Sequence, residues 1–353
     1  MANILVTGGG GFIGSHVAEF YAKNKKVNTI YIIDNLSRAK LLKKANNNFR
    51  YNWDYLKQYD NILFFKRDIK NYNFLKSFFK KNPIDIVIHT AAQTAVTTSI
   101  IDPLTDFENN MIGTFSLLEA IRRSKLNPTI IFCSTNKVFG NNVNNLKVIE
   151  SDSRYQFLEE NALGIFESFP IDLCEHTPYG ASKLCSDIYF QEYAHTYGLK
   201  SAVFRMSCIY GTRQFGVEDQ GWVAHLIISA LTGKKINIFG DGKQVRDILY
   251  ISDLINVFDA FIKKADKIKH DVFCIGGGAD NTLSLLELIE ILEELSKNNI
   301  KYEFFNWRPS DQRIFVSDIS KAKKQLEWTP KVNPHDGVKK IVDWIKINID
   351  LFT

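Results

Sequence analysis

The stretch Thr7-Gly-Gly-Gly-Gly-Phe-Ile-Gly14 follows a short apolar run and precedes an amphipathic segment. Its glycines at positions 8, 11 and 14 have the spacing of a turn that joins a strand to a helix and binds a dinucleotide. Without side chains, such a backbone turns tightly and approaches a pyrophosphate, whose charge the amino terminus of the helix stabilises. A glycine-rich turn without a ligand is the alternative. Because the motif lies between a predicted strand and a predicted helix, we favour the interpretation that it binds a dinucleotide.

Apolar runs and amphipathic segments alternate along the following two hundred or so residues. This alternation predicts right-handed crossovers and a doubly wound, Rossmann-like parallel sheet, that is, an α/β fold. The predicted strands are Ile4–Thr7, Thr29–Asp34, Ile62–Lys66, Ile84–His89, Thr129–Ser134 and Ser201–Arg205. The predicted helices between them include Phe12–Lys23, Phe74–Lys81 and Phe107–Arg123.

After residue 207 the alternation loosens, which predicts a smaller α/β domain interleaved with the first. Helices at Trp222–Thr232 and Ser284–Lys297 and a strand at Ile236–Phe239 belong to this region. We expect residues 1–206 and 236–275 to bind the dinucleotide, and residues 207–235 and 276–353 to bind a substrate. Two long connections, 35–60 and 141–177, are either lids or poorly ordered segments, and lids are favoured because both leave the carboxyl ends of strands.

The composition and charge of the chain exclude several classes of protein. The chain has 353 residues, 45% of them hydrophobic and 24% charged, which is typical of a globular protein of about two domains. The net charge of +5 is spread over interspersed acids and bases, so neither nucleic acid nor a membrane is an expected partner. No export signal is visible, and the five cysteines lack paired spacing, which predicts free, mostly buried thiols in the cytoplasm. The seven histidines form no ligand pair, so we predict no metal site.

Acidic residues follow the second and third predicted strands. Asp34 lies 20 residues after Gly14, where a carboxylate accepts hydrogen bonds from both hydroxyls of an adenosine ribose. Because that carboxylate repels a 2′-phosphate, NAD is favoured over NADP, although Arg38 lies close by in the sequence. Asp68 and Ile69 end the third strand and are placed to meet the adenine, or else lie in an ordinary loop.

Tyr179 and Lys183 are four residues apart at the start of an amphipathic helix, so they share one helix face. An ammonium beside a phenol favours the phenolate, which predicts a lowered pKa for Tyr179. The phenolate would take a proton from a sugar hydroxyl while a hydride leaves the same carbon. Thr135, just beyond the fifth strand, is placed to bind the same oxygen. We therefore predict Thr135, Tyr179 and Lys183 as the catalytic residues.

Taken together, these motifs resemble the extended short-chain dehydrogenase/reductase family, which contains NAD-dependent nucleotide-sugar epimerases and dehydratases. The resemblance covers essentially the whole chain, and its marks are Thr7–Gly14, His89–Gln93, Asn110–Thr114, Thr135, Tyr179 with Lys183, Phe204–Gly211, Arg246-Asp247 and Leu326–Pro330. Other segments resemble more particularly the members that epimerise carbon 2 of a CDP-sugar: Thr97–Ile100, Ser134–Val138, Arg213–Phe215, Asp219–Trp222, Gly242–Asp247 and Ser310–Val316. Two positions depart from the family pattern. Cys208 replaces an asparagine near the substrate phosphates, and Phe139 replaces a tyrosine.

The resemblance implies a role for each matching residue. NAD would contact Gly8, Gly11, Phe12, Ile13, Gly14, Asp34, Asn35, Ser37, Arg38, Asp68, Ile69, Ala91, Ala92, Gln93, Asn110, Ser134, Tyr179 and Lys183. The nucleotide sugar would contact Gln93, Thr97, Thr98, Thr135, Ser207, Cys208, Arg246, Arg308 and Asp311. The two arginines would clamp the diphosphate, for which a guanidinium fork is suited, and Asp311 would bind the substrate ribose.

The resemblance implies an isomerase that oxidises a CDP-linked sugar to a keto-sugar and returns the hydride to the opposite face, as in the synthesis of polysaccharide sugars. Three alternatives stay open. A 4-epimerase of the UDP-sugar type would use the same residues with a different sugar pose. A 4,6-dehydratase would need the Asp-Glu pair that Asn136 and Lys137 replace. A non-catalytic NAD-binding sensor would have no use for Thr135, Tyr179 and Lys183. The resemblance also implies a homodimer or homotetramer.

Overall fold

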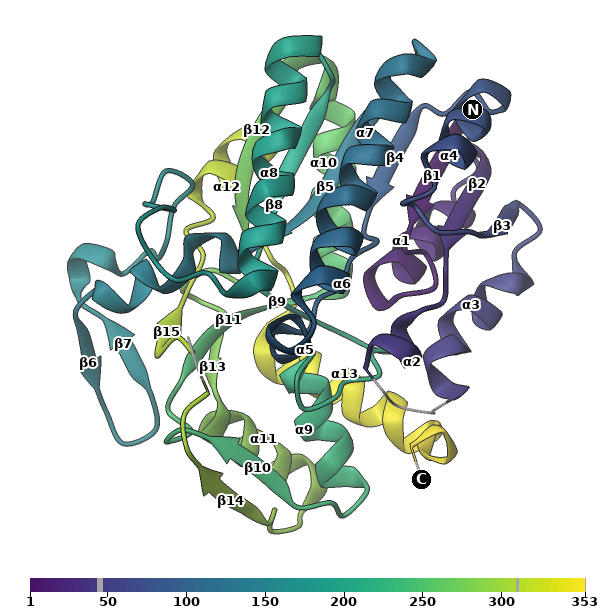
Figure 1. Ribbon diagram of the computed structural model, residues 1–353. Helices are drawn as coiled ribbons and strands as arrows, with labels where there is room; N and C mark the ends of the chain where they lie inside the picture. Colours follow the sequence, from purple (N-terminus) through teal and green to yellow (C-terminus); the bar gives the residue numbers. More distant parts are fainter. Residues whose placement is uncertain (43–46, 309–310, 353) are drawn as a thin grey trace. The chain divides into compact units, whose positions relative to one another are not determined.

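The computed structural model describes residues 1–42, 47–308 and 311–352, so Ser310 of the Ser310–Val316 segment lies outside the described residues. A seven-stranded sheet has the order β12-β8-β5-β4-β1-β2-β3 (Figure 1). Its strands are β1 (Ala2–Thr7), β2 (Val27–Asp34), β3 (Ile62–Lys66), β4 (Ile86–His89), β5 (Thr129–Thr135), β8 (Ser201–Met206) and β12 (His270–Ile275).

The order of the strands reverses beside β1. β1 pairs in parallel with β2 on one side and with β4 on the other. β2 also pairs in parallel with β3, and β4 with β5. In doubly wound sheets, ligands bind at the carboxyl ends of the strands where the order reverses. This point lies after Thr7 of β1 and His89 of β4, and the predicted doubly wound fold is confirmed.

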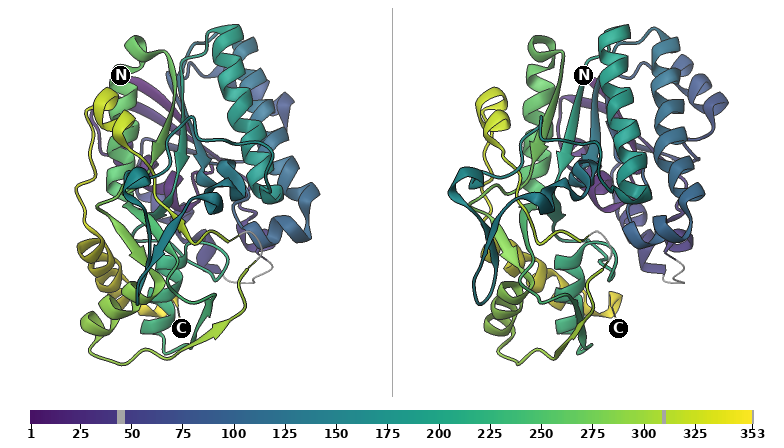
Figure 2. Two further views of the ribbon diagram at one scale, coloured as in Figure 1. Left: turned by 90° about the vertical axis from the view of Figure 1, so that its left-hand side faces the viewer. Right: turned by 60° about the vertical axis from the view of Figure 1, so that its left-hand side comes forward.

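Helices cover both faces of the sheet. They are α1 (Phe12–Ala22), α4 (Tyr72–Lys81), α7 (Gly113–Ser124), α8 (Thr177–Tyr197) and α10 (Ile251–Ile268). Figure 2 shows α7 and α8 on one face of the sheet and α10 on the other. Successive residues of a strand point to opposite faces, and β8 illustrates this. Val203 belongs to the cluster that packs under α7 and α8, whereas Phe204 stacks on Phe258 of α10, with ring centroids 5.4 Å apart.

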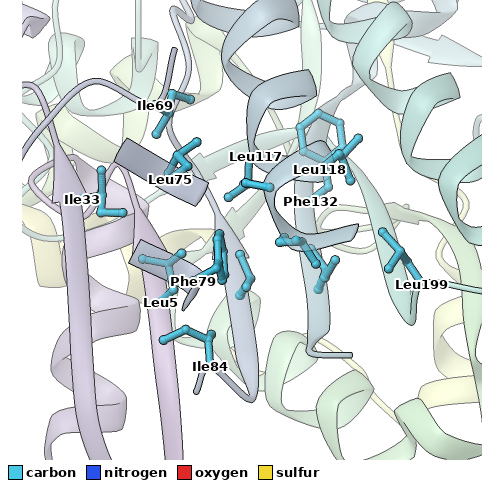
Figure 3. Packing of buried hydrophobic residues seen from close by; sticks show 14 of the residues in the cluster. Leu5, Ile33, Ile69, Leu75, Phe79, Ile84, Leu117, Leu118, Phe132 and Leu199 are labelled. Carbon is cyan, nitrogen blue, oxygen red and sulfur yellow. The ribbon is translucent and has the colours of Figure 1, made fainter. Parts of the chain in front are cut away.

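The main core lies between the sheet and the helices α4, α7 and α8. Leucine, isoleucine and phenylalanine side chains from both layers interdigitate there (Figure 3). Phe132 of β5 stacks on Phe190 of α8, with ring centroids 4.4 Å apart. Because both rings are buried and stacked, this contact fixes α8 against β5. The Lys183 ammonium lies over the ring of Phe132, 4.2 Å from its centroid.

The predicted helix Phe107–Arg123 is interrupted. The chain forms α6 (Pro103–Phe107), a π-helical turn (Glu108–Ile112) and then α7. A π-turn adds one residue to a helical turn and is frequent at functional sites. The helical period of the apolar residues predicted the helix correctly but gave no sign of the additional residue.

The described residues form two compact units. The first comprises Met1–Val138, Thr177–Arg205 and Val257–Phe273, and the second comprises Phe139–His176, Met206–Asn256 and Cys274–Thr353, of which Thr353 is outside the described residues. These bounds differ from the predicted ones, because residues 139–176 and 236–256 group with the second unit. The assignment of cofactor and substrate to the two parts of the chain stays a prediction.

The second unit contains two small sheets and a hairpin. β11 (Val245–Tyr250) pairs with β13 (Thr282–Ser284), β15 (Ile314–Phe315) and β9 (Cys208–Tyr210). β10 (Ile236–Phe239) pairs in parallel with β14 (Tyr302–Phe305). The helices of this unit are α9 (Trp222–Leu231), α11 (Leu285–Ser296), α12 (Ser320–Leu326) and α13 (Pro334–Ile347). The predicted helices near residues 222–232 and 284–297 and the strand Ile236–Phe239 are therefore present.

Both long connections contain secondary structure. The first holds α2 (Arg38–Leu41) and α3 (Tyr51–Tyr55), and the second holds a hairpin of β6 (Val148–Glu150) and β7 (Tyr155–Phe157). A short helix α5 (Val96–Ile101) follows β4. No helix in the described part of the chain combines the length and the apolar character that crossing a bilayer requires.

The five cysteines are free, as predicted, but the expectation that most are buried is wrong. Cys133 and Cys274 are buried, Cys174 and Cys208 are half-buried, and Cys185 is exposed. The sequence pattern around Cys185 does not distinguish the two faces of α8, because that helix packs on several neighbours at once.

Candidate active site

The glycine-rich turn lies where the strand order reverses. Gly8 has a left-handed φ of +72°, and a Cβ atom on it would lie 2.6 Å from the backbone nitrogen of Ala91. A Cβ on Gly14 would lie 2.4 Å from the carbonyl oxygen of Gly8. Gly11 precedes the first turn of α1, which has no side-chain cap and no acidic residue. The amides at this helix start are therefore not neutralised by a side chain, and the turn fits a pyrophosphate.

Asp34 ends β2 beside this turn. Its Oδ2 accepts a hydrogen bond from the Gly10 amide at 2.9 Å, and its Oδ1 accepts one from the Leu36 amide at 2.7 Å. Desolvation raises the pKa of Asp34, and the two amides oppose that effect. The carboxylate is thus held at the end of β2, close to the glycine turn, as the prediction of a ribose ligand requires.

The residues after β2 and β3 bind one another. Asn35 Nδ2 donates to Asp68 Oδ2 at 3.0 Å, and Asn35 Oδ1 accepts from the Ser37 amide at 3.0 Å. Ile69, next to Asp68, is buried against Gly113. Arg38 lies over the ring of Phe49, with its guanidinium carbon 4.7 Å from the ring centroid, and burial lowers the pKa of Arg38 to about 10. The structure therefore gathers the residues predicted for the adenosine at one edge of the sheet.

Three residues of α8 contact three consecutive residues of β5. The side chain of Tyr179 is hydrogen-bonded to that of Thr135, and Lys183 Nζ donates to the carbonyl oxygen of Cys133 at 2.6 Å. One further turn along, Asp187 Oδ2 accepts from Ser134 Oγ at 2.8 Å. Positions i, i+4 and i+8 share one helix face, so this face brings Tyr179 and Lys183 to β5, which carries Thr135.

Thr135, Tyr179 and Lys183 are all buried, with exposed fractions of 7%, 8% and 3%. Burial lowers the pKa of Lys183 to about 8, while the neighbouring Cys133, Asp187 and Asp106 partly oppose this. Burial also raises the pKa of Tyr179 to about 12. The hydrogen bond with Thr135 lowers the pKa of Tyr179, whereas the charges of Asp106 and Cys133 raise it further.

The predicted effect of Lys183 on Tyr179 is therefore wrong for the chain by itself. Desolvation outweighs any stabilisation of the phenolate, and the Lys183 ammonium is bound to the Cys133 carbonyl. The sequence spacing placed the two residues correctly on one face of the helix. It could not show how deeply that face is buried.

A buried polar cluster surrounds Gln93 and Asn110. Asn110 Oδ1 accepts from the Gln93 amide at 2.8 Å, and Asn110 Nδ2 donates to Ser182 Oγ at 3.0 Å. Asp106 accepts from the side chains of both Gln93 and Asn110, each at 3.1 Å, and from Ser182 Oγ at 2.5 Å. Asp106 and Ser182 were not predicted as site residues. The spacing of four between Asp106 and Asn110 is the signal that could have linked them.

The start of α8 is held by a residue that the sequence prediction also missed. Ser99 of α5 is buried, and its Oγ accepts a hydrogen bond from the Tyr179 amide at 3.1 Å. This contact satisfies one of the free amides at the start of the helix. Thr97 and Thr98 lie on the same short helix and are half-buried. Ala91 and Ala92 precede Gln93 in the segment that follows β4.

The second unit contains the other residues predicted to bind substrate. Ser207 Oγ donates to the carbonyl oxygen of Asp247 at 3.1 Å. Cys208 Sγ accepts a hydrogen bond from the indole nitrogen of Trp222 at 3.3 Å, so the thiol has a partner within the second unit. The asparagine expected from the resemblance would present an amide to the same indole.

Both predicted clamp arginines have carboxylate partners. Arg246 Nη2 donates to Asp311 Oδ1 at 2.8 Å. Arg308 Nη2 lies 3.2 Å from Glu218 Oε1, and its Nη1 lies 3.6 Å from Asp219 Oδ1. The guanidinium of Arg308 also lies over the ring of Phe239, 4.0 Å from its centroid. Arg246 and Asp311 are thus brought together, and Arg308 belongs to a separate group of contacts.

The fold and these motifs agree with three comparisons. The profile of the family described as GDP-mannose 4,6 dehydratase matches residues 5–341. The chain therefore belongs to the extended short-chain dehydrogenase/reductase family, of which this group is part.

Individual relatives are similar over their full length. CDP-paratose 2-epimerase from Salmonella typhi is 40% identical over 346 residues, covering 97% of this chain and 98% of that protein. UDP-glucuronate 4-epimerase from Thermodesulfobacterium geofontis is 32% identical over 353 residues, covering 99% and 98%. Among solved structures, a variant of UDP-glucuronic acid 4-epimerase from Bacillus cereus with a fluorinated UDP-sugar and NAD has a TM-score of 0.81 and 29% identity, covering 98% and 99%.

Proposed function

We propose that this chain is an NAD-dependent nucleotide-sugar epimerase, and more specifically an epimerase of the CDP-paratose (CDP-tyvelose) 2-epimerase type. The observation that carries the proposal is the alignment of Tyr179, Lys183 and Asp187 of α8 with Thr135, Cys133 and Ser134 of β5. The 40% identity with CDP-paratose 2-epimerase supports the choice of carbon 2 and of a CDP-linked sugar.

The chain's own residues fit NAD. The left-handed Gly8 and the crowded Gly14 leave room only for backbone at the turn, and Asp34 is fixed at the end of β2. NAD, when bound, supplies an acceptor for a hydride and a positive charge beside the phenol. The residues Gly8 to Gly14 would hold its pyrophosphate, Asp34 its adenosine ribose, and Tyr179 and Lys183 its nicotinamide end.

Tyr179 is the proton acceptor in this proposal. Thr135 binds the phenol oxygen and would place the substrate hydroxyl against it. Lys183, one helical turn from Tyr179, would supply a cation to this end of the site, and its ammonium is anchored on the Cys133 carbonyl. Because burial raises the pKa of Tyr179 to about 12, the phenol holds its proton until positive charge gathers beside it. The proton is then removed only when the other components of the reaction are in place.

Arg246 and Arg308 are proposed to bind the diphosphate of the substrate. Each guanidinium already has carboxylate partners, Asp311 for Arg246 and Glu218 with Asp219 for Arg308. These carboxylates orient the arginines in the free chain. A diphosphate would replace these carboxylates or bind beside them, since a guanidinium group can donate hydrogen bonds to two anions along different edges. Holding the nucleotide at a non-reacting part retains the sugar while it turns.

The position after Thr135 argues against a dehydratase. Elimination of water requires a carboxylic acid close to the catalytic threonine, as the resemblance implies. Here Asn136 follows, and its Oδ1 accepts a hydrogen bond from Thr135 Oγ1 at 3.2 Å. An amide oxygen at that place cannot deliver a proton to a leaving hydroxyl. A 4-epimerase is the second candidate, and the 32% identity with UDP-glucuronate 4-epimerase favours it.

The test is a panel of CDP-, UDP-, GDP- and dTDP-sugars incubated with the purified protein and followed by NMR. We expect inversion at carbon 2 of a CDP-sugar. Deuterium placed at that carbon should stay in the sugar, and its loss to solvent would contradict the return of the hydride. In Tyr179→Phe we expect turnover at least about 100-fold lower while the chain still binds NAD. Unchanged turnover of every sugar in Tyr179→Phe would refute the catalytic assignment.

Two finer properties stay predictions. A homodimer or homotetramer is favoured by large apolar side chains exposed along the π-helical turn, α7 and α8, among them Ile112, Phe115, Ile188 and Tyr189. A cytoplasmic location is favoured by five free thiols. The synthesis of polysaccharide sugars is a further expectation, which follows from the type of sugar proposed.

A further inference from the structure

Asp106 is a buried carboxylate that the proposed reaction has not yet used. It lies on α6, one residue before the end of that helix, and its exposed fraction is 1%. Its Oδ2 accepts from Ser182 Oγ at 2.5 Å, and its Oδ1 accepts from Gln93 Nε2 and Asn110 Nδ2 at 3.1 Å each. All three donors are neutral. In the part of the chain that the structure describes, no lysine or arginine nitrogen lies within ion-pair distance of this carboxylate.

The π-helical turn Glu108–Ile112 places this carboxylate. The carbonyl oxygen of Asn110 accepts hydrogen bonds from Thr114 Oγ1 and, at 2.9 Å, from Ser186 Oγ, and the second bond ties the turn to α8. The Asn110 side chain then reaches both Asp106 and Ser182. Burying a carboxylate among neutral donors has a desolvation cost that an uncharged side chain of the same shape would avoid. This cost calls for a role of the charge.

Two ionisable groups act on Tyr179 from the elements packed against it: Asp106 from α6 and Cys133 from β5. Lys183 lies one helical turn further along α8. The charge of Asp106 acts on both catalytic side chains, since it raises the pKa of Tyr179 and that of Lys183. Lys183 in turn acts on Asp106, whose own pKa is raised by burial.

We propose that Asp106 is a positioning residue, whose buried carboxylate orders Ser182, Gln93 and Asn110 and offsets part of the positive charge that gathers beside Tyr179. This inference rests on the proposed function. An epimerase uses one phenol in both directions: the phenolate takes a proton from the sugar hydroxyl, and the phenol gives it back when the carbonyl is reduced. Lys183 and oxidised NAD would together place two positive charges near the phenolate. With one anion beside them, the phenol keeps enough proton affinity to complete the second step.

The experiment compares Asp106→Asn with the native chain. The amide is isosteric, its oxygen still accepts from Gln93 and Asn110, and its nitrogen donates to Ser182 Oγ, whose hydroxyl hydrogen is free to turn. Protein carrying ¹³Cζ-labelled tyrosine is titrated by NMR without cofactor, and Tyr179→Phe assigns the resonance. We expect the Tyr179 midpoint to fall by about 1 unit in Asp106→Asn. From a pKa of about 12, the phenolate fraction at pH 11 then rises from about one tenth to about one half. In Asp106→Asn, the acidic limb of the pH profile of kcat/KM should likewise move to lower pH.

Two further variants separate charge from structure. Glu108→Gln removes a neighbouring carboxylate that is half-buried and paired with Lys70 at 3.0 Å, and should shift the Tyr179 midpoint by less than about 0.2 units. Ser182→Ala keeps the Asp106 charge and removes one hydrogen bond, and should shift it by less than half as much as Asp106→Asn. Circular dichroism establishes that each variant is folded.

An unchanged midpoint in Asp106→Asn, or an equal shift in Ser182→Ala, overturns the inference. Either result leaves the epimerase proposal intact if the native chain inverts a nucleotide sugar and Tyr179→Phe does not. Conversely, a native chain that converts no nucleotide sugar refutes the proposed function, and the NMR titration of Tyr179 is still measured independently.

Discussion

Removing Arg205 tests the buried ion pair behind the proposed active site. Arg205 of β8 binds Asp187 of α8 through two parallel contacts, Nε to Oδ2 at 3.0 Å and Nη2 to Oδ1 at 3.1 Å. Both side chains are buried, with exposed fractions of 5% and 0%. Asp187 also accepts from Ser134 Oγ at 2.8 Å and from Gln191 Nε2 at 2.7 Å. The substitution Arg205→Met keeps much of the volume and leaves this carboxylate without its cation.

The magnitude follows from this environment. Removing one partner of a buried pair costs about 3–5 kcal/mol, because the other charge stays buried without compensation. Two neutral donors remain on Asp187, so we expect the lower end, about 3 kcal/mol. For 353 residues that unfold in one transition, this corresponds to a Tm lower by about 4 °C.

Urea unfolding followed by tryptophan fluorescence measures these free energies. The double variant Arg205→Met/Asp187→Asn carries no buried charge, and we expect it to be more stable than Arg205→Met alone by about 1.5 kcal/mol or more. A loss below about 1 kcal/mol in Arg205→Met, or a double variant less stable than the single one, would refute the reasoning.

Two further predictions concern the glycine turn and the second unit. In Gly14→Ala, a Cβ 2.4 Å from the Gly8 carbonyl oxygen should weaken NAD binding at least about tenfold by calorimetry; Gly198→Ala, where no atom lies within 4 Å of the added Cβ, should leave the affinity unchanged. Burial raises the pKa of Asp247 from 3.8 to about 6, so the contribution of this carboxyl group to native stability should fall by about 2.4 kcal/mol as the pH rises from about 4 to 7. Asp247→Asn should lack that decline in urea unfolding at the two pH values, and an identical decline in both chains would contradict the assignment.

Much of the fold could be predicted from the sequence because the determining signals are local. The glycine spacing in Thr7–Gly14, the short apolar runs and the position of Asp34 each lie within a few residues of the structure they specify. Tyr179 and Lys183 were paired correctly for the same reason, since a spacing of four fixes one helix face. Strand ends were predicted to within two residues for β1, β2, β4 and β8.

The contacts that were missed join residues far apart in the chain. Ser99 binds the start of α8 across 80 positions, and Asp106 meets Ser182 across 76. No periodicity reports such a pairing. The raised pKa of Tyr179 was missed for a related reason, because desolvation depends on every element packed around the phenol. The ion pairs of Arg246 and Arg308 likewise depend on tertiary packing.

The single additional residue in Glu108–Ile112 has a consequence for deletions in this segment. Upstream of it the helix directs Asp106 toward Ser182, and downstream it directs Leu117 and Leu118 into the core. Loss of one codon there would restore a regular helix and rotate the upstream part by about 100° relative to the downstream part. The core around Leu117 and Leu118 would stay packed, whereas Asp106 would no longer point toward Ser182. Deleting one residue there could thus leave the fold intact and remove Asp106 from its place beside Ser182.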